Sequence, residues 1–414
     1  MPASELVEQE VRDLVDRAWP ELVDLCGDLV AAPSVNPPGD TRAVARVVAE
    51  FLAAAGLDHE LVHQDPSMPS VLAQAAGSGP GRHLVLNVHL DTMEPGDESL
   101  WSVPRFSLTR RDGRLYGLGM GNMKGAVAGM ALAFRVLARD TQSWSGRLTF
   151  TAVSDECVFG DNGAAFLLQG RNAEVIGDAL ICGEGPGFGR LAVAEKGVAW
   201  YELTATAEGG HSSRAQAGAT ASARLAAAVQ ILDSMNDLRA TAPAGLEGLA
   251  PEDVEALRLS VNAGRLDGGT FISQIATTAT AQLDLRVPPG ITLAEVDGEI
   301  NHRLGGRPGV TWRQLKGWEA NASGLDQPFV QTFAGAVQDM TGSPAVSTVR
   351  LPASDASRWR SRGVPAVCYG LQPTLSAGID DYAEEQAVRD CAAVYALAAL
   401  RFLTGDRPAG DVPR

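Results

Sequence analysis

The sequence has few cysteines, and no two of them are closely spaced. Its 414 residues include five cysteines, an odd number, and there is no Cys-x-x-Cys pair. A disulfide framework shows as an even number of cysteines at short spacings in a small secreted chain. The sequence therefore predicts no disulfide framework and favours the reducing cytoplasm as its location. The five cysteines are Cys26, Cys157, Cys182, Cys368 and Cys391.

Long apolar runs and an excess of positive charge are also missing. No apolar stretch approaches the roughly 20 residues that a membrane-spanning helix needs. The first residues, Met1–Leu6, lack the basic and apolar regions of a signal peptide, so we expect none. Lys and Arg number 34 against 50 Asp and Glu, which gives a formal net charge of −16. Because an acidic surface attracts neither nucleic acid nor an anionic membrane, we expect neither as a partner, whereas small neutral or cationic substrates are compatible.

The length and the order of the expected elements indicate two domains. A chain of 414 residues exceeds what one core usually holds. Up to about residue 194, and again from about 318, strand-like runs alternate with helical patterns, which predicts an α/β domain with a mostly parallel sheet. Between them, alternating strands and two helices predict an α+β insert with an antiparallel sheet. We therefore predict a catalytic α/β domain of residues 1–194 and 318–414, interrupted by a lid or dimerisation domain of residues 195–317.

Polar residues follow three of the expected strands. The strands are Leu84–Val88, Leu148–Val153 and Ala179–Cys182, and the residues that follow them are His89 and Asp91, then Asp155 and Glu156, then Glu184. Ligands of α/β sheets bind beyond the carboxyl ends of the strands. Because alternate residues of a strand point to the same side, His89 and Asp91 can form a metal ligand and the carboxylate that orients it. The sequence therefore predicts a site at this edge of the sheet.

Several motifs accompany these strand ends in a fixed order. They are Gly117–Gly125 (GLGMGNMKG), Ser154–Cys157 (SDEC), Gly183–Pro186 (GEGP), Gly210–Ser213 (GHSS) and Leu283–Arg286 (LDLR), with Ser34–Gly39 and Ser354-Asp355 in support. Together they resemble the M20 family of zinc peptidases and amidohydrolases, which includes acetylornithine deacetylase, succinyl-diaminopimelate desuccinylase, aminoacylase-1 and the glutamate carboxypeptidases. The resemblance covers nearly the whole chain, and it is specific as a joint pattern although each motif alone is weak.

The resemblance implies a role for each matching residue. In the family, two zinc ions share a bridging carboxylate and a bridging water, and a glutamate acts as general base on that water. His89 and Glu184 match ligands of the first ion, Asp91 matches the aspartate that orients the histidine, and Glu156 matches the general base. In the lid, His211 matches the histidine that stabilises the oxyanion, commonly from the partner subunit. Arg286 matches the arginine that holds a substrate carboxylate.

Three departures from the family pattern concern the metal ligands. Asn122 stands where the family has its bridging aspartate, and a neutral amide bridges two dications poorly. Cys157 stands where the family has a glutamate of the second ion, although a thiolate can bind zinc. No histidine follows His302, whereas the family places its last ligand near the C-terminus, where this chain reads SAGIDDY at 376–382. Asp380 or Asp381 is a weak substitute. The resemblance therefore predicts one zinc ion or none, held by His89 and Glu184 with Asn122 and Cys157 as weak or atypical ligands.

Alternative interpretations of single residues stay open. Cys157 could be a small buried filler, a metal ligand, or a nucleophile paired with His211. Arg286 could merely pair with Asp284 or another acidic residue of the lid. Ser273 stands about where the family has a substrate-binding asparagine, so we predict substrate contacts for Ser273 as well as for Arg286 and Asn122.

Three functions follow from these residues. The first is hydrolysis of an amide bond in a small N-acyl amino acid or a dipeptide-like substrate, with Glu156 as general base. The second is a metal-independent reaction, such as cyclisation, elimination or acyl transfer in a specialised pathway, that uses Glu156 and His211. The third is non-catalytic binding of an amino-acid derivative. The resemblance also predicts a small amino-acid-derived molecule as the partner and a homodimer formed through the lid domain.

Overall fold

The chain forms two compact units in its computed structural model, which describes residues 3–187, 189–246, 255–371 and 378–405. The first unit comprises Met1–Val193, Ser323–Thr348 and Ser354–Arg414, and the second comprises Ala194–Ala322 and Val349–Ala353. The domain boundaries 1–194, 195–317 and 318–414 stay a prediction. Within the described ranges, no helix combines the length and the apolar composition that crossing a membrane requires.

The first unit is built around a sheet whose central strands run parallel. Its strand order is β1-β2-β6-β3-β7-β15-β8. β3 pairs in parallel with β6 and β7, and β7 with β15, whereas the outer pairs β1–β2, β2–β6 and β15–β8 are antiparallel. This arrangement confirms the predicted α/β class with a mostly parallel sheet. The strands are β1 (His59–Val62), β2 (Ser70–Ala76), β3 (His83–His89), β6 (Arg147–Val153), β7 (Ala179–Cys182), β8 (Arg190–Glu195), β14 (Val346–Arg350, beside β8) and β15 (Ala366–Cys368).

β3 is covered on both faces of the sheet. Leu84, Val85, Leu86 and Val88 have no exposed surface. A strand that is buried on both sides needs apolar residues at consecutive positions, which is why this segment is a continuous apolar run instead of an alternating one. The end of the strand is therefore held inside the unit, and His89 is only 1% exposed.

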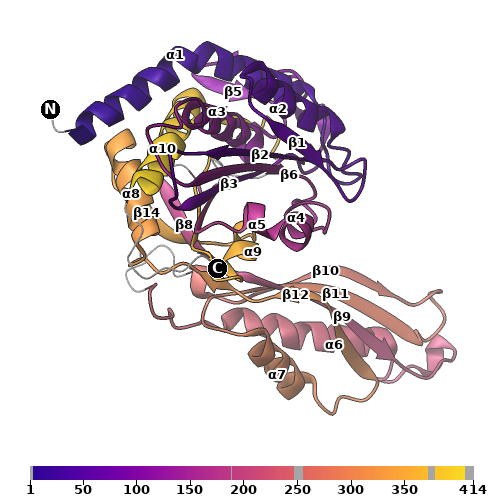
Figure 1. Cartoon of the computed structure of the whole chain (residues 1–414). Helices are drawn as coiled ribbons and strands as arrows, with labels where there is room; N and C mark the ends of the chain where they lie inside the picture. Colours follow the sequence, from indigo (N-terminus) through magenta and orange to yellow (C-terminus); the bar gives the residue numbers. More distant parts are fainter. Residues whose placement is uncertain (1–2, 188, 247–254, 372–377, 406–414) are drawn as a thin grey trace. The chain divides into compact units, whose positions relative to one another are not determined.

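Helices cover both faces of this sheet (Figure 1). On one face α3 and α10 pack on β3, and α2 packs on β2, with α1 and α8 outside them. On the other face α5 packs on β6, α9 packs on β7, and α4 joins the same apolar cluster. The helices are α1 (Ala3–Ala31), α2 (Arg42–Ala54), α3 (Gly125–Arg139), α4 (Ala164–Gly170), α5 (Asn172–Val175), α8 (Pro328–Thr341), α9 (Ala356–Arg360) and α10 (Glu385–Thr404).

Small residues let α3 approach α10 closely. A Cβ atom at Gly129 would lie 3.5 Å from Ala392, so the two backbones are near contact distance. Helices whose facing positions are Gly and Ala can pack this closely because no long side chain separates them. The turn η2 (Met120–Lys124) leads directly into α3 and carries Asn122.

A small antiparallel sheet lies at the start of α10. Its strand order is β16-β5-β4, and Tyr382 on β16 pairs with Tyr116 on β5. Their rings are 5.5 Å apart, which adds an aromatic contact to the cross-strand pair. The strands are β4 (Thr109–Arg111), β5 (Arg114–Tyr116) and β16 (Tyr382–Glu384), and a short 3₁₀ turn, η1 (Glu98–Leu100), precedes them.

The second unit is an antiparallel sheet with two helices on one face. The strand order is β10-β11-β9-β12, and alternate residues of β9 and β11 join α6 and α7 in one apolar cluster. Thr292 and Glu295 form a reciprocal capping box that starts α7. The elements are β9 (Gly197–Thr206), η3 (Ser212–Arg214), α6 (Ala221–Asp233), η4 (Ser234–Asp237), β10 (Ser260–Gly268), β11 (Thr278–Val287), α7 (Leu293–Leu304), β12 (Val310–Trp318) and β13 (Asn321–Ala322). β13 pairs with the last two residues of β8. The predicted α+β texture of this part is confirmed.

Candidate active site

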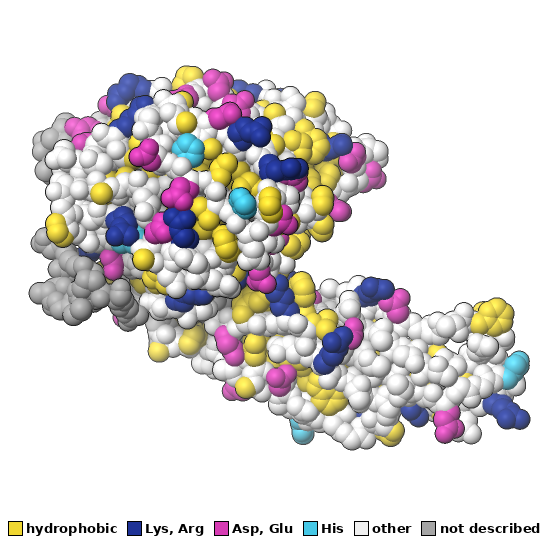
Figure 2. All heavy atoms as spheres, turned by 45° about the vertical axis from the view of Figure 1, so that its right-hand side comes forward, with side chains coloured by type: hydrophobic (Ala, Val, Ile, Leu, Met, Phe, Trp, Pro, Cys, Tyr) yellow, Lys and Arg dark blue, Asp and Glu magenta, His cyan; other side chains and the backbone are white. Residues whose placement is uncertain are grey.

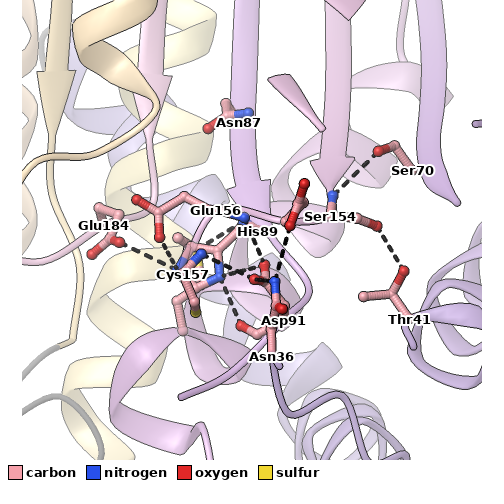
Figure 3. A network of polar contacts seen from close by, with 12 residues as sticks. Asn36, Thr41, Ser70, Asn87, His89, Asp91, Ser154, Glu156, Cys157 and Glu184 are labelled. Carbon is pink, nitrogen blue, oxygen red and sulfur yellow. Dashed lines mark hydrogen bonds and ion pairs between the residues drawn. The ribbon is translucent and has the colours of Figure 1, made fainter. Parts of the chain in front are cut away.

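The carboxyl ends of β3, β6 and β7 bring four of the predicted residues together. His89 ends β3, Asp91 follows it, Glu156 follows β6, and Glu184 follows β7. Because the three strands are parallel neighbours, the residues beyond their carboxyl ends meet at one edge of the sheet. Figure 3 shows these side chains pointing toward one another. All four are at most 9% exposed.

The imidazole of His89 is enclosed by oxygen atoms. Nδ1 donates to the backbone carbonyl of Asp91 at 2.8 Å and lies 3.5 Å from its Oδ1. Nε2 lies 3.2 Å from Oε1 of Glu184 and 3.7 Å from Oε2 of Glu156. An imidazole that donates from both nitrogens carries a positive charge.

Burial and charge act against each other in this cluster. Burial alone would lower the pKa of His89, but Asp91, Glu184 and Glu156 raise it well above the ordinary value. Burial, aided by Glu184, raises the pKa of Glu156 well above the ordinary value, although His89 opposes the shift. A carboxyl group with a raised pKa, beside an imidazole, is suited to accept and return protons near neutral pH.

Both carboxylate oxygens of Asp91 already have partners. Oδ2 accepts from Nδ2 of Asn36 at 2.9 Å and from the backbone N–H of Cys157 at 3.0 Å. Oδ1 accepts from the backbone N–H of Glu156 at 3.1 Å. Asp91 is therefore placed to hold the turn after β6 and to contact His89.

Asn122 lies in η2, where its backbone leaves helical geometry at φ −144° and ψ 100°. The next residue, Met123, contacts the candidate site, because its sulfur lies 3.2 Å from the backbone nitrogen of His89. The Oδ1 atom of Asn122 is buried and has no hydrogen-bond partner among the described residues. A buried amide oxygen without a partner costs about 1–3 kcal/mol. It is therefore available to a cation or to a donor group of a substrate.

Cys157 is partly buried and free. Burial, followed by the nearby carboxylates of Asp91, Glu156 and Glu184, raises the pKa of its thiol well above the ordinary value. A thiol in acidic surroundings stays protonated, which makes it a poor nucleophile and a poor zinc ligand. This environment speaks against the nucleophile interpretation.

The two C-terminal aspartates have other partners. Asp380 accepts from the backbone N–H and the hydroxyl of Ser102 at 2.7 and 2.6 Å. Asp381 accepts from the backbone N–H groups of Gly119 and Gly121 at 2.7 and 3.1 Å, and so holds the turn before Asn122, where Gly119 has a φ of 88° that favours glycine. Neither aspartate belongs to a group that could hold a metal ion within the described ranges. Residues 376 and 377 of the SAGIDDY segment lie outside the described residues.

Asp355 was not predicted as a site residue. It is 5% exposed, and its Oδ2 has no hydrogen-bond partner among the described residues. Burial raises its pKa to about 7, with Arg358 and His89 opposing the shift. The Ser354-Asp355 pair resembles the family pattern, and this was the one signal that could have marked it.

The site residues of the second unit lie at two ends of one strand. The backbone N–H of Ser212, beside His211, donates to the carbonyl of Ser273 at 3.0 Å, before the start of β11. Arg286 lies near the far end of β11, where Nε and Nη2 donate to Oδ2 of Asp284 at 3.1 and 3.0 Å. At about 3.4 Å per residue, the strand between them spans roughly 25 Å. The structure thus brings His211 and Ser273 together and leaves Arg286 at the other end.

The donor atoms fit one zinc ion. Zinc–ligand bonds of about 2.0–2.2 Å place the ligand atoms of a tetrahedral ion roughly 3.3–3.6 Å apart. Nε2 of His89 lies 3.2 Å from Glu184 and 3.7 Å from Glu156, and these three residues form one of two candidate groups in the described ranges. The other group, His89, Asp91 and Cys157, depends on an aspartate whose oxygens are already engaged. Among the described residues, the group of His89, Glu184 and Glu156 is therefore the better ligand set for an ion.

These features define an α/β enzyme with a buried acid–base cluster at its strand ends. Residues 85–401 match the sequence model of peptidase family M20/M25/M40. The chain belongs to this family of peptidases and amidohydrolases, as the resemblance predicted.

Charged side chains of both signs are interspersed on the face that Figure 2 shows.

Known relatives include enzymes that act on amino-acid derivatives. The chain is 28% identical over 292 residues to acetylornithine deacetylase of Proteus mirabilis, which covers 69% of this chain and 72% of the relative. It is 27% identical over 393 residues to succinyl-diaminopimelate desuccinylase of Xanthobacter autotrophicus, with 92% and 99% covered.

Solved structures share the fold. Human carnosine dipeptidase 1 has a TM-score of 0.74 at 15% identity and covers 96% of this chain and 99% of its own. A dinuclear metal-binding M20 peptidase of Bacillus subtilis has a TM-score of 0.68 at 15% identity, with 94% and 98% covered. At these identities the likeness concerns the fold alone.

Proposed function

We propose that this protein hydrolyses the amide bond of a small N-acyl amino acid or a dipeptide-like substrate. The observation that carries the proposal is the position of Glu156, whose buried carboxylate lies 3.7 Å from Nε2 of His89 at the strand-end site. The deacetylase, desuccinylase and dipeptidase names of relatives support this substrate class.

Glu156 acts as the general base and then as the general acid. Its carboxylate accepts a proton from the attacking water while the water oxygen bonds to the amide carbon. It then returns the proton to the amine nitrogen as the C–N bond breaks, so the products are a free amine and a carboxylic acid, which releases its proton to water. Asp91 holds Glu156 in place through the backbone N–H and orients His89.

One zinc ion would be held by His89 and Glu184, with the amide oxygen of Asn122 as the third ligand. This set leaves Glu156 free to act as base. Bound zinc lowers the pKa of a water ligand and polarises a carbonyl. The unpartnered Oδ1 of Asn122 supports its inclusion. If zinc is bound without Asn122, the amide oxygen of Asn122 is placed to accept a hydrogen bond from a substrate N–H.

His211 pairs with Gln274, before β11 begins, whereas Arg286 lies near the other end of β11, and this separation bears on the subunit arrangement. A small substrate cannot span roughly 25 Å. We infer a homodimer in which one copy supplies Arg286 to the substrate carboxylate and the other supplies His211 to the oxyanion. Ser273, joined to the His211 loop, would then reach the same substrate from the second copy.

A metal-independent reaction is the second candidate. It is motivated by the retention of Glu156 and His211 in a chain where Asn122 and Cys157 stand at positions of the family's metal ligands. Glu156 and His211 would then serve cyclisation, elimination or acyl transfer without an ion. This candidate accounts for the loss of the second-ion ligands without a new ligand set.

The test uses the purified full chain, a panel of N-acyl amino acids and dipeptides, and zinc content by mass spectrometry. We expect hydrolysis that follows zinc content, and we expect Glu156→Gln to lower kcat by about 10²- to 10⁴-fold because the proton acceptor is lost. Glu174→Gln is the control, since it removes a carboxylate that pairs with Arg171 away from the site.

The outcomes separate the candidates. Hydrolysis by zinc-free protein after thorough chelation would contradict the zinc-assisted route. A non-hydrolytic turnover of zinc-free protein that Glu156→Gln abolishes would support the second candidate. Full activity of Glu156→Gln would contradict both.

A further inference from the structure

Asn36 lies far from His89 in sequence, yet its side chain ends in the candidate active site (Figure 3). Its backbone N–H donates to the carbonyl of Thr92 at 2.8 Å, and the N–H of Thr92 donates back to Ser34 at 2.9 Å. Val35 completes a parallel bridge with Thr92. The loop that carries Asn36 is therefore fixed to the chain directly after Asp91, and Asn36 is only 6% exposed.

The carboxamide of Asn36 joins two carboxylates from different strand ends. Its Nδ2 donates to Oδ2 of Asp91, after β3, at 2.9 Å and to Oδ1 of Asp155, after β6, at 3.2 Å. A carboxamide nitrogen has two N–H bonds, which allows one bond to each acceptor. Hydrogen bonds to ionised groups are about twice as strong as neutral ones, and this donor stabilises two buried carboxylates without adding a charge.

Each of these carboxylates holds part of the turn that carries Glu156. Asp91 accepts from the backbone N–H groups of Glu156 and Cys157 at 3.1 and 3.0 Å. Asp155 accepts from the backbone and side-chain nitrogens of Asn162 at 3.2 and 2.8 Å. The backbone positions on both sides of the Glu156 side chain thus depend on carboxylates that Asn36 holds.

The turn is closed tightly around Asp155. A Cβ atom at Gly160 would lie 1.8 Å from Oδ2 of Asp155, so only glycine fits there. Asp155 itself has a φ of 66°, in the left-handed region that few residues other than glycine adopt. A turn held in this way by one carboxylate responds to any shift of that carboxylate.

We propose that Asn36 is a positioning residue that sets the orientation of Glu156 through Asp91 and Asp155. The expected effect of Asn36 on catalysis rests on the proposed function, in which Glu156 moves the proton. The effect of Asn36 on the position of the Glu156 turn does not depend on that function. Asn36 contacts Asp91 and Asp155, and through Asp91 it also bears on His89, whose Nδ1 donates to the carbonyl of Asp91.

The experiment compares Asn36→Ala with Asn87→Ala in the full chain. Asn87 is a matched control, because it is a fully buried asparagine on β3 whose Nδ2 donates to the hydroxyl of Thr151 at 3.2 Å. Both variants remove a buried carboxamide near the same strand. Only Asn36→Ala removes the link between the two carboxylates.

Amide hydrogen exchange of residues 154–162 is the first readout, because it requires no substrate. We expect Asn36→Ala to speed exchange at Glu156 and Cys157 by about 10- to 100-fold, the effect of weakening hydrogen bonds to a charged acceptor. In Asn87→Ala, the exchange rate of this segment should rise only as much as the loss of global stability of that variant requires. The second readout is the split between kcat and KM, where Asn36→Ala should lower kcat by about 10- to 100-fold with KM little changed.

Equal exchange in the two variants overturns the proposal whatever the activity shows. Faster exchange in Asn36→Ala without any amide hydrolysis in either protein supports the positioning role and contradicts the proposed reaction instead. If Asn36→Ala does not fold, the side-chain NH₂ of Asn36 in the unmodified protein decides. Slow solvent exchange of both protons supports two buried acceptors, and rapid exchange of both overturns the bridge.

Discussion

His83 and His89 stand at opposite ends of β3, and their imidazoles meet opposite surroundings. Nε2 of His83 lies 2.8 Å from the hydroxyl of Thr149, and burial followed by Arg147 lowers its pKa to about 4. Nε2 of His89 lies between Glu184 and Glu156, and carboxylates raise its pKa above the ordinary value in spite of burial. One strand therefore has a histidine with a lowered pKa at its start and a histidine with a raised pKa at its end.

The difference separates the effect of burial on the pKa of a histidine from the effect of the charged groups at each edge of the sheet. Burial disfavours the charged imidazole at both positions. The amino ends of the neighbouring strands contribute Arg147, which opposes protonation, whereas the carboxyl ends are followed by Glu156 and Glu184, which favour it. The proposed chemistry thus belongs to the carboxyl edge, whereas the histidine at the other edge, His83, contacts Thr149.

Replacing His89, the histidine at the carboxyl edge, should have a larger effect on turnover than replacing His83. We predict that His89→Gln lowers turnover on the order of 10³-fold, within the range for loss of a positioned acid–base group. It should also abolish zinc binding, because His89 belongs to every ligand set that fits. Steady-state kinetics and zinc content of the two histidine variants measure the effect.

His83→Gln is the matched variant, and turnover should stay within about threefold of the unmodified protein, as expected for a position away from the site. Glutamine keeps a donor within reach of Thr149. Similar losses of turnover in both variants would contradict the assignment of the site to the carboxyl edge.

The next effect concerns acid stability and depends on His83. An unfolded histidine has a pKa near 6.5, whereas His83 in the folded chain has a pKa of about 4. Between these values the unfolded chain binds the extra proton, so the contribution of His83 to stability is complete above pH 6.5 and is lost as the pH falls toward 4. The free energy of unfolding should therefore fall by about 2–3 kcal/mol more in the unmodified protein than in His83→Gln between pH 7 and 4.5.

Urea unfolding of both proteins at several pH values measures this difference. Arg147 and Asp178 act on His83 with opposite signs, so Asp178→Asn should lower the pKa of His83 further. If the free energy of unfolding changed equally with pH in the unmodified protein and in His83→Gln, His83 would not be buried in its neutral form.

The elements with strong periodicity could be predicted from the sequence, and the contacts between distant segments could not. The expected strand Ala179–Cys182 matches β7, and Leu84–Val88 matches β3 within one residue at each end. Apolar runs and glycine or proline boundaries act locally, which is why they are readable. The antiparallel outer pairs of the sheet were not predicted, because strand order depends on which segments meet in space.

The same limit applies to the candidate site. Residues directly after strands, such as His89, Asp91 and Glu184, were predictable because the strand end itself marks them. Asn36 and Asp355 belong to the Ser34–Gly39 and Ser354-Asp355 motifs, but their role depends on partners more than 50 positions away in sequence, such as Asp91 for Asn36. A pattern along the chain does not show which side chains share a buried cluster.

A smaller effect is expected from adding a charged ligand at the carboxyl edge of the sheet. In Asn122→Asp, the unpartnered amide oxygen becomes a charged carboxylate. We predict that zinc affinity rises by at least about tenfold, or about 1.4 kcal/mol, because an anionic ligand attracts a dication more strongly than an amide does. Chelator competition measures the affinity, and the Tm with and without zinc should diverge, since zinc binds only the folded chain.

Asn87→Asp is the control for this change, because the carboxamide of Asn87, on β3, already has partners on the neighbouring strands, the hydroxyl of Thr151 and the thiol of Cys182. It should lower the Tm with and without zinc by the same amount. An unchanged zinc affinity in Asn122→Asp would mean that Asn122 is no ligand. The ion would then depend on His89, Glu184 and Glu156, and a carboxylate that binds zinc is a weaker base toward the attacking water than a free carboxylate. The outcome therefore decides whether zinc and the general base can coexist at this site, which hydrolysis by the proposed route requires.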